Sequence, residues 1–263
     1  MTTPTLPKII FFDIDDTLYI KFENRIPDST KLALHQLKAK GIIVAIATGR
    51  GICVFPPCVR ELVAEVGIDV FVTINGQYNE YRGSPLVDFP LTPAQIRHTT
   101  DYLTKENIAY GYMTRDEIIG FHETPPMTHA LNSLHIPYRI ADEFDMNTPV
   151  YQILAFYENN KTANLELGEN LKTVRWHISG VDILDKDGSK ARGIRAVLDK
   201  LGLTMADAWA FGDGLNDIEM LSSVGFGVAM GNAHDDLKAV ADYVCPSHKD
   251  DGIFRGLQML GVI

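Results

Sequence analysis

Short apolar runs alternate with amphipathic stretches along the first part of the chain. The runs KIIFFDI, IIVAIA and DVFVTI have the length of strands, and their continuous apolar character is typical of strands buried on both faces of a parallel sheet. Between the first two, a helix is expected that Asp28 or Ser29 could cap and Gly41 would end. A second helix is expected from Pro57 to Val66. This βαβαβ order predicts an α/β fold with a doubly wound parallel sheet.

The pattern changes in the middle of the chain, where the strand-like runs contain Tyr, His and Arg, so that one face of a sheet is expected to meet water. The helices expected there are Thr92–Asn107, one after Pro126 and Asn159–Asn170. Apolar strands and amphipathic helices of the first kind resume at Ser189. We therefore predict a doubly wound core formed by residues 1–82 and 186–263, with an α+β domain inserted at residues 83–185.

Composition narrows the range of functions. The chain has 263 residues and a formal net charge of −10, and nucleic-acid-binding surfaces are basic, so no nucleic-acid partner is expected. A phosphorylated small substrate needs only local positive charge and is not excluded. The three cysteines form no CxxC pair, which argues against a disulfide framework and a zinc ribbon. Neither a signal peptide nor an apolar run of ~20 residues is present, so a cytoplasmic protein without a membrane partner is expected.

Polar side chains follow the strand-like runs, at the carboxyl ends where doubly wound sheets bind their ligands. Any single Asp or Asn there is explained by the preference of these residues for loops. The joint pattern is harder to explain in that way. The groups after strands are Asp13-Ile14-Asp15-Asp16-Thr17, Thr48-Gly49-Arg50, Asn75-Gly76 and Asp213-Gly214-Leu215-Asn216-Asp217. The helix after the insert starts with Ser189-Lys190, which belongs to the same pattern.

The order DIDDT, ATGR, SK and GDGLND resembles the four motifs of the haloacid dehalogenase (HAD) superfamily. The long insert resembles a type C2 cap, and TINGQY and GVAMGNA are similar to the Cof-type branch of sugar and metabolite phosphatases. The resemblance covers essentially the whole chain. Its DxDxT and GDxxND motifs are specific, whereas TGR and a lone lysine are weak. Ala191 stands where the family pattern has Gly, which leaves the start of that helix open.

The resemblance implies roles for the catalytic residues. Asp13 is expected to be the nucleophile that forms an aspartyl-phosphate. Asp15 is expected to act as general acid and then general base, with a pKa raised by the neighbouring acids. Thr48 and Lys190 complete the expected catalytic set, and these two, with Asn216, are expected to bind the substrate phosphate.

The resemblance also implies a Mg²⁺ cofactor, which suits oxygen ligands. Its expected ligands are the side chains of Asp13 and Asp213 and the backbone carbonyl of Asp15. Asp217 is not expected to bind the ion directly. It is expected to orient Lys190 or a metal-bound water. Asp16 is expected to brace the loop by hydrogen bonds to amides. Arg50 has two open roles, because arginine can bind a phosphate or form an ion pair with an acid.

The predicted function is Mg²⁺-dependent hydrolysis of a phosphomonoester, with a small phosphorylated metabolite as the partner. A sugar phosphate is favoured, and pyridoxal phosphate and flavin mononucleotide remain alternatives. A phosphotransferase or mutase of the same family is a second hypothesis, although mutases usually carry a smaller cap. A receiver-like signalling domain is a third, although its phospho-acceptor follows a later strand and such domains are about half as long as this chain or shorter. The sequence does not indicate the oligomeric state.

Overall fold

The computed structural model of the chain describes residues 5–158, 167, 168 and 170–263. The chain forms two compact units. The first comprises Met1–Arg50, Phe55–Asp88 and Ser189–Ile263, and the second comprises Gly51–Val54 and Phe89–Gly188. The insert was expected at residues 83–185, so the second unit begins and ends somewhat later and also takes in a short segment after Arg50.

The first unit contains an eight-stranded sheet with the order β14-β13-β12-β1-β2-β3-β4-β5. Its strands are β1 (Ile9–Phe12), β2 (Ile43–Ala47), β3 (Val70–Thr73), β4 (Tyr78–Tyr81), β5 (Ser84–Asp88), β12 (Ala208–Gly212), β13 (Phe226–Ala229) and β14 (Tyr243–Val244). The strands from β14 to β3 pair in parallel, whereas β4 and β5 pair antiparallel at one edge. The three apolar runs are thus confirmed as neighbouring parallel strands, and β1 lies in the middle of the sheet.

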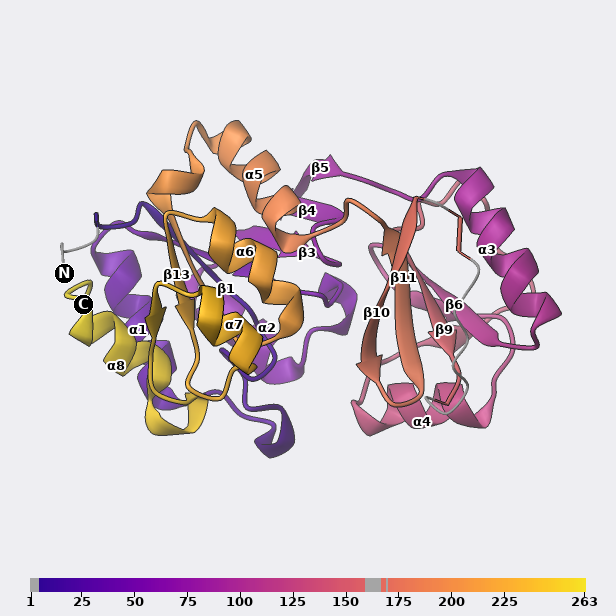
Figure 1. The fold of residues 1–263 in the computed structure, drawn as a ribbon, viewed down its shortest axis with the longest axis horizontal. Coiled ribbons are helices and arrows are strands. Elements are labelled where there is room, and N and C mark those ends of the chain that lie inside the picture. Colours follow the sequence, from indigo (N-terminus) through magenta and orange to yellow (C-terminus); the bar gives the residue numbers. More distant parts are fainter. Residues whose placement is uncertain (1–4, 159–166, 169) are drawn as a thin grey trace. The chain divides into compact units, whose positions relative to one another are not determined.

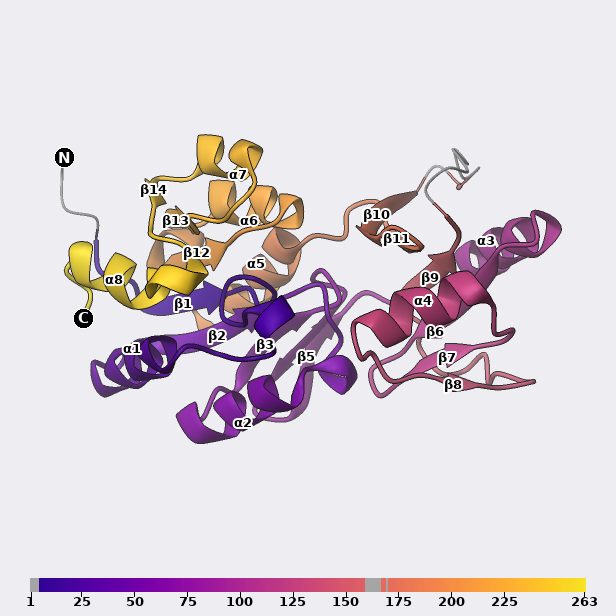
Figure 2. The same ribbon diagram turned by 90° about the horizontal axis from the view of Figure 1, so that it is seen from below.

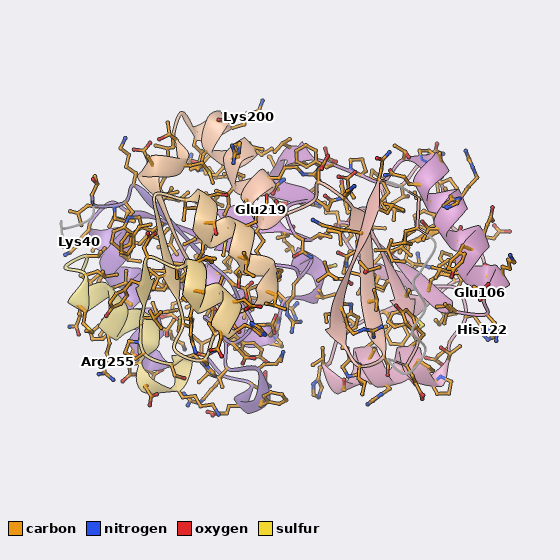
Figure 3. The ribbon with its side chains drawn as sticks, in the orientation of Figure 1. Lys40, Glu106, His122, Lys200, Glu219 and Arg255 are labelled. Atoms are coloured by element: carbon orange, nitrogen blue, oxygen red, sulfur yellow. The ribbon has the colours of Figure 1, made fainter. Side chains whose placement is uncertain are left out.

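Helices cover both faces of this sheet, as a doubly wound fold requires. The helices are α1 (Asp28–Ala39), α2 (Pro57–Val66), α5 (Lys190–Leu201), α6 (Ile218–Ser223), α7 (Asp235–Val240) and α8 (Gly252–Met259). The α1, α2 and α8 helices lie on one face, and α5, α6 and α7 lie on the other (Figures 1 and 2). Charged residues such as Lys200 and Arg255 are exposed on these helices (Figure 3).

The capping prediction for α1 is wrong. Pro27 occupies the N-cap position, the helix begins at Asp28, and no side chain caps it. A proline with its φ fixed near the required value can precede a helix, and Asp28 in the first turn is still favourable beside the positive end of the helix dipole. The α2 helix spans Pro57–Val66 as predicted.

The second unit contains a six-stranded sheet with the order β10-β11-β9-β6-β7-β8. Its strands are β6 (Ala109–Met113), β7 (Ile118–Gly120), β8 (Arg139–Ile140), β9 (Gln152–Phe156), β10 (Leu171–His177) and β11 (Gly180–Asp185), and its helices are α3 (Pro93–Lys105) and α4 (Pro125–Ser133). All its pairings are antiparallel except that of β7 with β8. The helix predicted at Asn159–Asn170 falls mostly outside the described residues.

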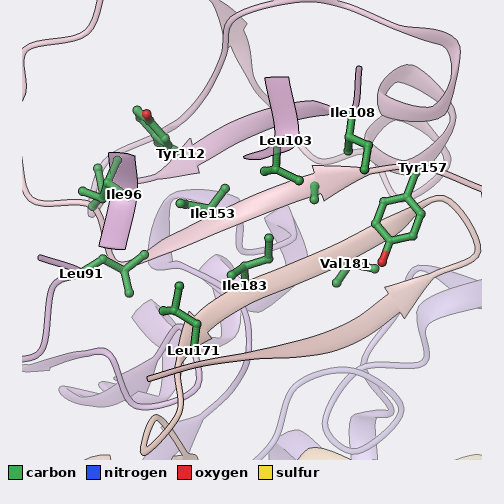
Figure 4. Packing of buried hydrophobic residues seen from close by; sticks show 12 residues of the cluster. Leu91, Ile96, Leu103, Ile108, Tyr112, Ile153, Tyr157, Leu171, Val181 and Ile183 are labelled. Atoms are coloured by element: carbon green, nitrogen blue, oxygen red, sulfur yellow. The ribbon is translucent and has the colours of Figure 1, made fainter. Parts of the chain in front are cut away.

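A hydrophobic cluster between α3 and one sheet face holds the second unit together (Figure 4). Ile96 and Leu103 of α3 meet Ile153 and Ile183 of the sheet in this cluster. The opposite side of β11 carries Asp182, which is 7% exposed. Burial raises the pKa of Asp182 to about 8, although the neighbouring side chains of Trp176 and Gln152 oppose the rise. No helix of the described ranges is long and apolar enough to cross a membrane.

Candidate active site

The central strand β1 places Asp13 at the carboxyl end of the sheet. All four residues of β1 are fully buried between β12 and β2, so the strand is a rigid support for the residue that follows it. The Asp13 N–H donates to the Phe211 carbonyl at 3.0 Å, which extends the pairing with β12 by one residue. Asp13 is itself only 6% exposed.

Lys190 joins carboxylates from two different parts of the sheet. Its Nζ atom lies 2.6 Å from Asp13 Oδ1 and 2.6 Å from Asp217 Oδ1, and its side chain is completely buried. Asp213 completes the group, because one carboxylate oxygen each of Asp13, Asp213 and Asp217 lies within 4.8 Å of the others. The structure therefore brings together four residues that are up to 204 positions apart in the chain (217 − 13).

Burial and repulsion from neighbouring carboxylates raise the pKa values of Asp13 and Asp213. Burial raises the pKa of Asp13 to about 7, even though the charge of Lys190 lowers it. Burial and the charge of Asp13 raise the pKa of Asp213 to about 8. Burial would lower the pKa of Lys190, but Asp13 and Asp217 outweigh it and raise the pKa, so the ammonium group stays charged. One ammonium cannot balance three carboxylates, and the cluster has the charge and the oxygen ligands that suit a divalent cation.

Both carboxylate oxygens of Asp217 already accept hydrogen bonds. Its Oδ1 atom accepts from Lys190, and its Oδ2 atom accepts from the N–H groups of Asp213 and Gly214, at 3.0 Å each. These bonds fix the lysine and the backbone that carries Asp213. Asp13 and Asp213 are therefore better placed than Asp217 to offer oxygens to a cation.

Asp15 forms a bidentate ion pair with Arg50. Arg50 Nε lies 2.7 Å from Asp15 Oδ2, and Arg50 Nη2 lies 2.8 Å from Asp15 Oδ1. Burial would raise the pKa of Asp15, but the hydrogen bonds and charge of Arg50 outweigh burial and lower it. The expectation of a raised pKa is therefore wrong, because it considered the neighbouring acids and not the arginine. Of the two roles left open for Arg50, the structure shows the ion pair.

The loops after β2 and β3 hold further polar groups together. Thr48 is 1% exposed, and its Oγ1 atom accepts from the Arg50 N–H at 3.1 Å. Asn216 is exposed, and its Nδ2 atom donates to Asn75 Oδ1 at 3.2 Å. In the sequence, Asn75 is marked only by its place at the end of a strand. The one available clue was its position at a strand's carboxyl end, because its bond to Asn216 spans 141 positions.

The structure fixes the start of α5, which the sequence left open, and shows Asp16 bracing its loop as expected. Ser189 caps α5 by accepting from the Arg192 N–H at 3.1 Å, so the helix begins at Lys190 despite Ala191. Asp16 accepts from the Lys21 N–H at 3.2 Å, as expected of a residue that braces the loop.

The chain also matches a known protein family. The family described as haloacid dehalogenase-like hydrolase matches residues 10–257, which is nearly the whole chain. The chain belongs to this haloacid dehalogenase-like (HAD-like) hydrolase family.

Two phosphatase-named relatives match nearly the whole chain. A protein of Bacillus subtilis (strain 168) named "Putative phosphatase YkrA" is 34% identical over 97% of this chain and 98% of its own length. The 5-amino-6-(5-phospho-D-ribitylamino)uracil phosphatase YcsE of the same organism is 30% identical over 95% of this chain and 94% of its own. Both matches span the inserted unit as well as the core.

Solved structures also match this chain over nearly its whole length. A Geobacillus kaustophilus HTA426 protein without a named activity has a TM-score of 0.88 and 38% identity, covering 98% of this chain and all of its own. The HAD subclass IIB sugar phosphatase BT4131 has a TM-score of 0.87 and 28% identity, covering 97% of this chain and 99% of its own. The doubly wound fold predicted from the sequence is thereby confirmed.

Proposed function

We propose that the chain, a phosphatase of the HAD-like hydrolase family, hydrolyses the phosphomonoester of a small metabolite through an aspartyl-phosphate on Asp13, with Mg²⁺ as cofactor. The observation that carries the proposal is the buried contact of Lys190 with Asp13 and Asp217, beside Asp213. A buried nucleophilic carboxylate next to a fixed cation is what phosphoryl transfer requires, because the protein mainly positions groups and neutralises charge in that reaction.

Asp13 is the proposed nucleophile. Lys190 engages its Oδ1 atom, which leaves Oδ2 as the oxygen proposed to attack phosphorus. The oxygen of the leaving group then departs, and water afterwards attacks the phosphorus of the aspartyl-phosphate and releases phosphate and free Asp13. This route divides one difficult displacement into two easier ones.

Lys190 and Thr48 are proposed to bind the phosphoryl oxygens. The Lys190 ammonium is rigidly held, and a compact charge of this kind suits a phosphoryl oxygen. The Thr48 hydroxyl accepts from a backbone N–H, so its own proton remains available for donation. Asn216 is proposed to add an amide donor, with its orientation set by Asn75.

Asp15 is proposed to protonate the leaving oxygen and then to accept a proton from the attacking water. Its carboxylate is held by Arg50 in the structure, so it is poised as a base. To act first as an acid it must take up a proton, and we propose that substrate binding weakens its ion pair with Arg50.

Mg²⁺ would be held by the carboxylates of Asp13 and Asp213 and by the backbone carbonyl of Asp15. The acid cluster fits such an ion because the raised pKa values of Asp13 and Asp213 mark a site that lacks positive charge. When bound, the ion would supply positive charge that offsets repulsion between the acids and the substrate phosphate.

The substrate class is proposed from the relatives. One solved neighbour is named as a sugar phosphatase, and YcsE is named for a phosphorylated ribityl compound. Both names describe phosphate esters of polyhydroxylated carbon chains. A sugar phosphate or a related polyol phosphate is therefore the favoured substrate.

Hydrolysis of a generic aryl phosphate tests this function, followed by a panel of sugar, polyol, pyridoxal and flavin phosphates. We expect turnover with Mg²⁺ that EDTA abolishes, and loss of turnover in Asp13→Asn. An exposed acid in the second unit, Asp101, supplies the matched control Asp101→Asn, which should behave as wild type. Full activity in EDTA, or in Asp13→Asn, would contradict the proposal.

A further inference from the structure

The segment after β13, which contains the GNA of the sequence GVAMGNA, has no part in the proposed chemistry. Within it, the half-buried Asn232 bonds to two other segments. Its Nδ2 atom donates to the Asp16 carbonyl at 2.8 Å, across 216 positions of the chain. Its Oδ1 atom accepts from the His248 N–H at 3.0 Å. Asn232 therefore fastens the loop that follows β1 to the opposite half of the core.

The hydrogen bond from Asn232 holds a turn at Asp16 whose backbone has an uncommon conformation. Asp16 has a φ of 55°, in the left-handed region that non-glycine residues seldom adopt. Its N–H donates to the Tyr19 carbonyl at 2.7 Å, and its own carbonyl is held by Asn232. The peptide groups before and after Asp16 are both fixed as a result. The first of these carries the Asp15 carbonyl, and the second leads to Thr17.

Thr17, the residue after Asp16, links this turn to the cluster of Asp13, Asp213 and Asp217 by a hydrogen bond. It is 1% exposed, and its Oγ1 atom donates to Asp213 Oδ1 at 2.9 Å. The segment that carries Asn232 also contacts Asp213 directly, because the His234 N–H donates to the Asp213 carbonyl at 3.0 Å. One short segment thus holds the loop that carries Asp13 and the loop that carries Asp213.

We propose that Asn232 is a positioning residue that sets the spacing between the Asp13–Thr17 loop and Asp213, and thereby the affinity of the acid cluster for a divalent cation. It acts through the Asp16 carbonyl and Thr17, and it touches none of the reacting groups. The inference rests on the cation of the proposed function, but its test requires no turnover.

Calorimetric titration of the full chain with Mg²⁺ alone provides that test. Asn232→Leu removes both side-chain bonds without adding charge, and we expect Mg²⁺ to bind roughly 2- to 10-fold more weakly, as loss of a hydrogen bond implies. Asn232→Asp keeps the acceptor for the His248 N–H and adds a negative charge, which alone would tighten cation binding. Weaker binding in both variants separates positioning from electrostatics. Asn147→Leu, on the second unit, is the control and should bind as wild type.

A double-mutant cycle with Thr17→Val tests the route. If Asn232 acts through Thr17, the double variant should bind Mg²⁺ about as weakly as the weaker single variant. Thr17→Ser keeps the hydroxyl and should restore most of the affinity. Wild-type affinity in Asn232→Leu, tighter binding in Asn232→Asp, or fold-changes that multiply in the double variant would overturn the inference.

The same titration distinguishes this inference from the proposed function. A wild-type chain that binds Mg²⁺ but hydrolyses no phosphate ester would refute the proposed function and leave the positioning role testable. A wild-type chain that binds no Mg²⁺ would overturn the inference.

Discussion

Gly76 is the point where the loop after β3 touches the start of α5. A Cβ atom built on Gly76 would lie 2.1 Å from the Ser189 carbonyl oxygen and 3.0 Å from the Gly193 backbone nitrogen. Gly76 also has a φ of 80°, in the left-handed region. Gly76→Ala therefore strains its own backbone and drives the first turn of α5, which carries Lys190, away from the sheet.

The size of the effect can be worked out against a matched glycine. Gly83 has a φ of 74°, but a Cβ there would meet no atom within 4 Å. Left-handed strain of roughly 1–2 kcal/mol should therefore be common to Gly76→Ala and Gly83→Ala. Only Gly76→Ala adds the clash with backbone, for a further ~1–3 kcal/mol of lost stability. Relief of the clash needs a shift of roughly 1 Å, which at a catalytic group lowers the rate by ~100-fold.

Two assays measure these effects in the two alanine variants. Urea unfolding followed by circular dichroism gives the free energy of unfolding, and kcat/KM on an aryl phosphate reports the position of Lys190. We expect Gly76→Ala to be less stable than Gly83→Ala and about 100-fold less active. Equal stability and equal kcat/KM in the two variants would refute the reasoning, because the close approach to Ser189 would then have no consequence.

Three further predictions concern buried charge. Lys190→Met leaves buried acids without their cation and should lower the free energy of unfolding by about 3–5 kcal/mol. Lys186 is exposed, so Lys186→Met should have little effect. Equal urea midpoints for the two variants would argue against the prediction. Arg50→Met should raise the pKa of Asp15, so the limb of the pH–rate profile that reports Asp15 should move to higher pH, and an unmoved profile would count against the ion pair. The raised pKa of Asp182 implies stability that is present below pH 4 and lost as pH rises towards about 8, so thermal melts of Asp182→Asn should lack that loss; a parallel decline in both proteins would contradict it.

The strands and the Asp13–Thr17 loop could be predicted because they depend on the local sequence. Strands buried on both faces must be apolar throughout, which makes β1 and its two neighbours visible in the sequence. The strand β4, which lies between β3 and the edge strand β5, could not be found in that way, because its sequence YNEY is polar although its first three residues are buried. Its Asn79 side chain donates to the carbonyls of Gly76 and Val87, and such bonds make burial of a polar strand tolerable.

The side-chain pairings in the site could not be predicted, because they form between segments that are distant in the sequence. The pKa of Asp15 depends on Arg50, 35 positions away, and the direction of that side chain cannot be read from a motif. Asn75 gains its partner Asn216, and Asn232 gains the Asp16 carbonyl, only when the loops of the folded core meet. Residue type at strand ends thus predicted which groups gather, whereas their pairing required the structure.

Attack by Asp13 on phosphorus is the central claim, and oxygen-isotope labelling tests it most directly. The chain is incubated through several turnovers in oxygen-18-labelled water with its best phosphate ester, digested, and the peptide containing Asp13 is analysed by mass spectrometry. If each second displacement occurs at phosphorus, the label enters phosphate and Asp13 stays unlabelled, while rapid acid quenching traps a phosphoryl group on that peptide. Turnover with no phosphoryl group trapped on Asp13, or with label in its carboxylate, would contradict the account.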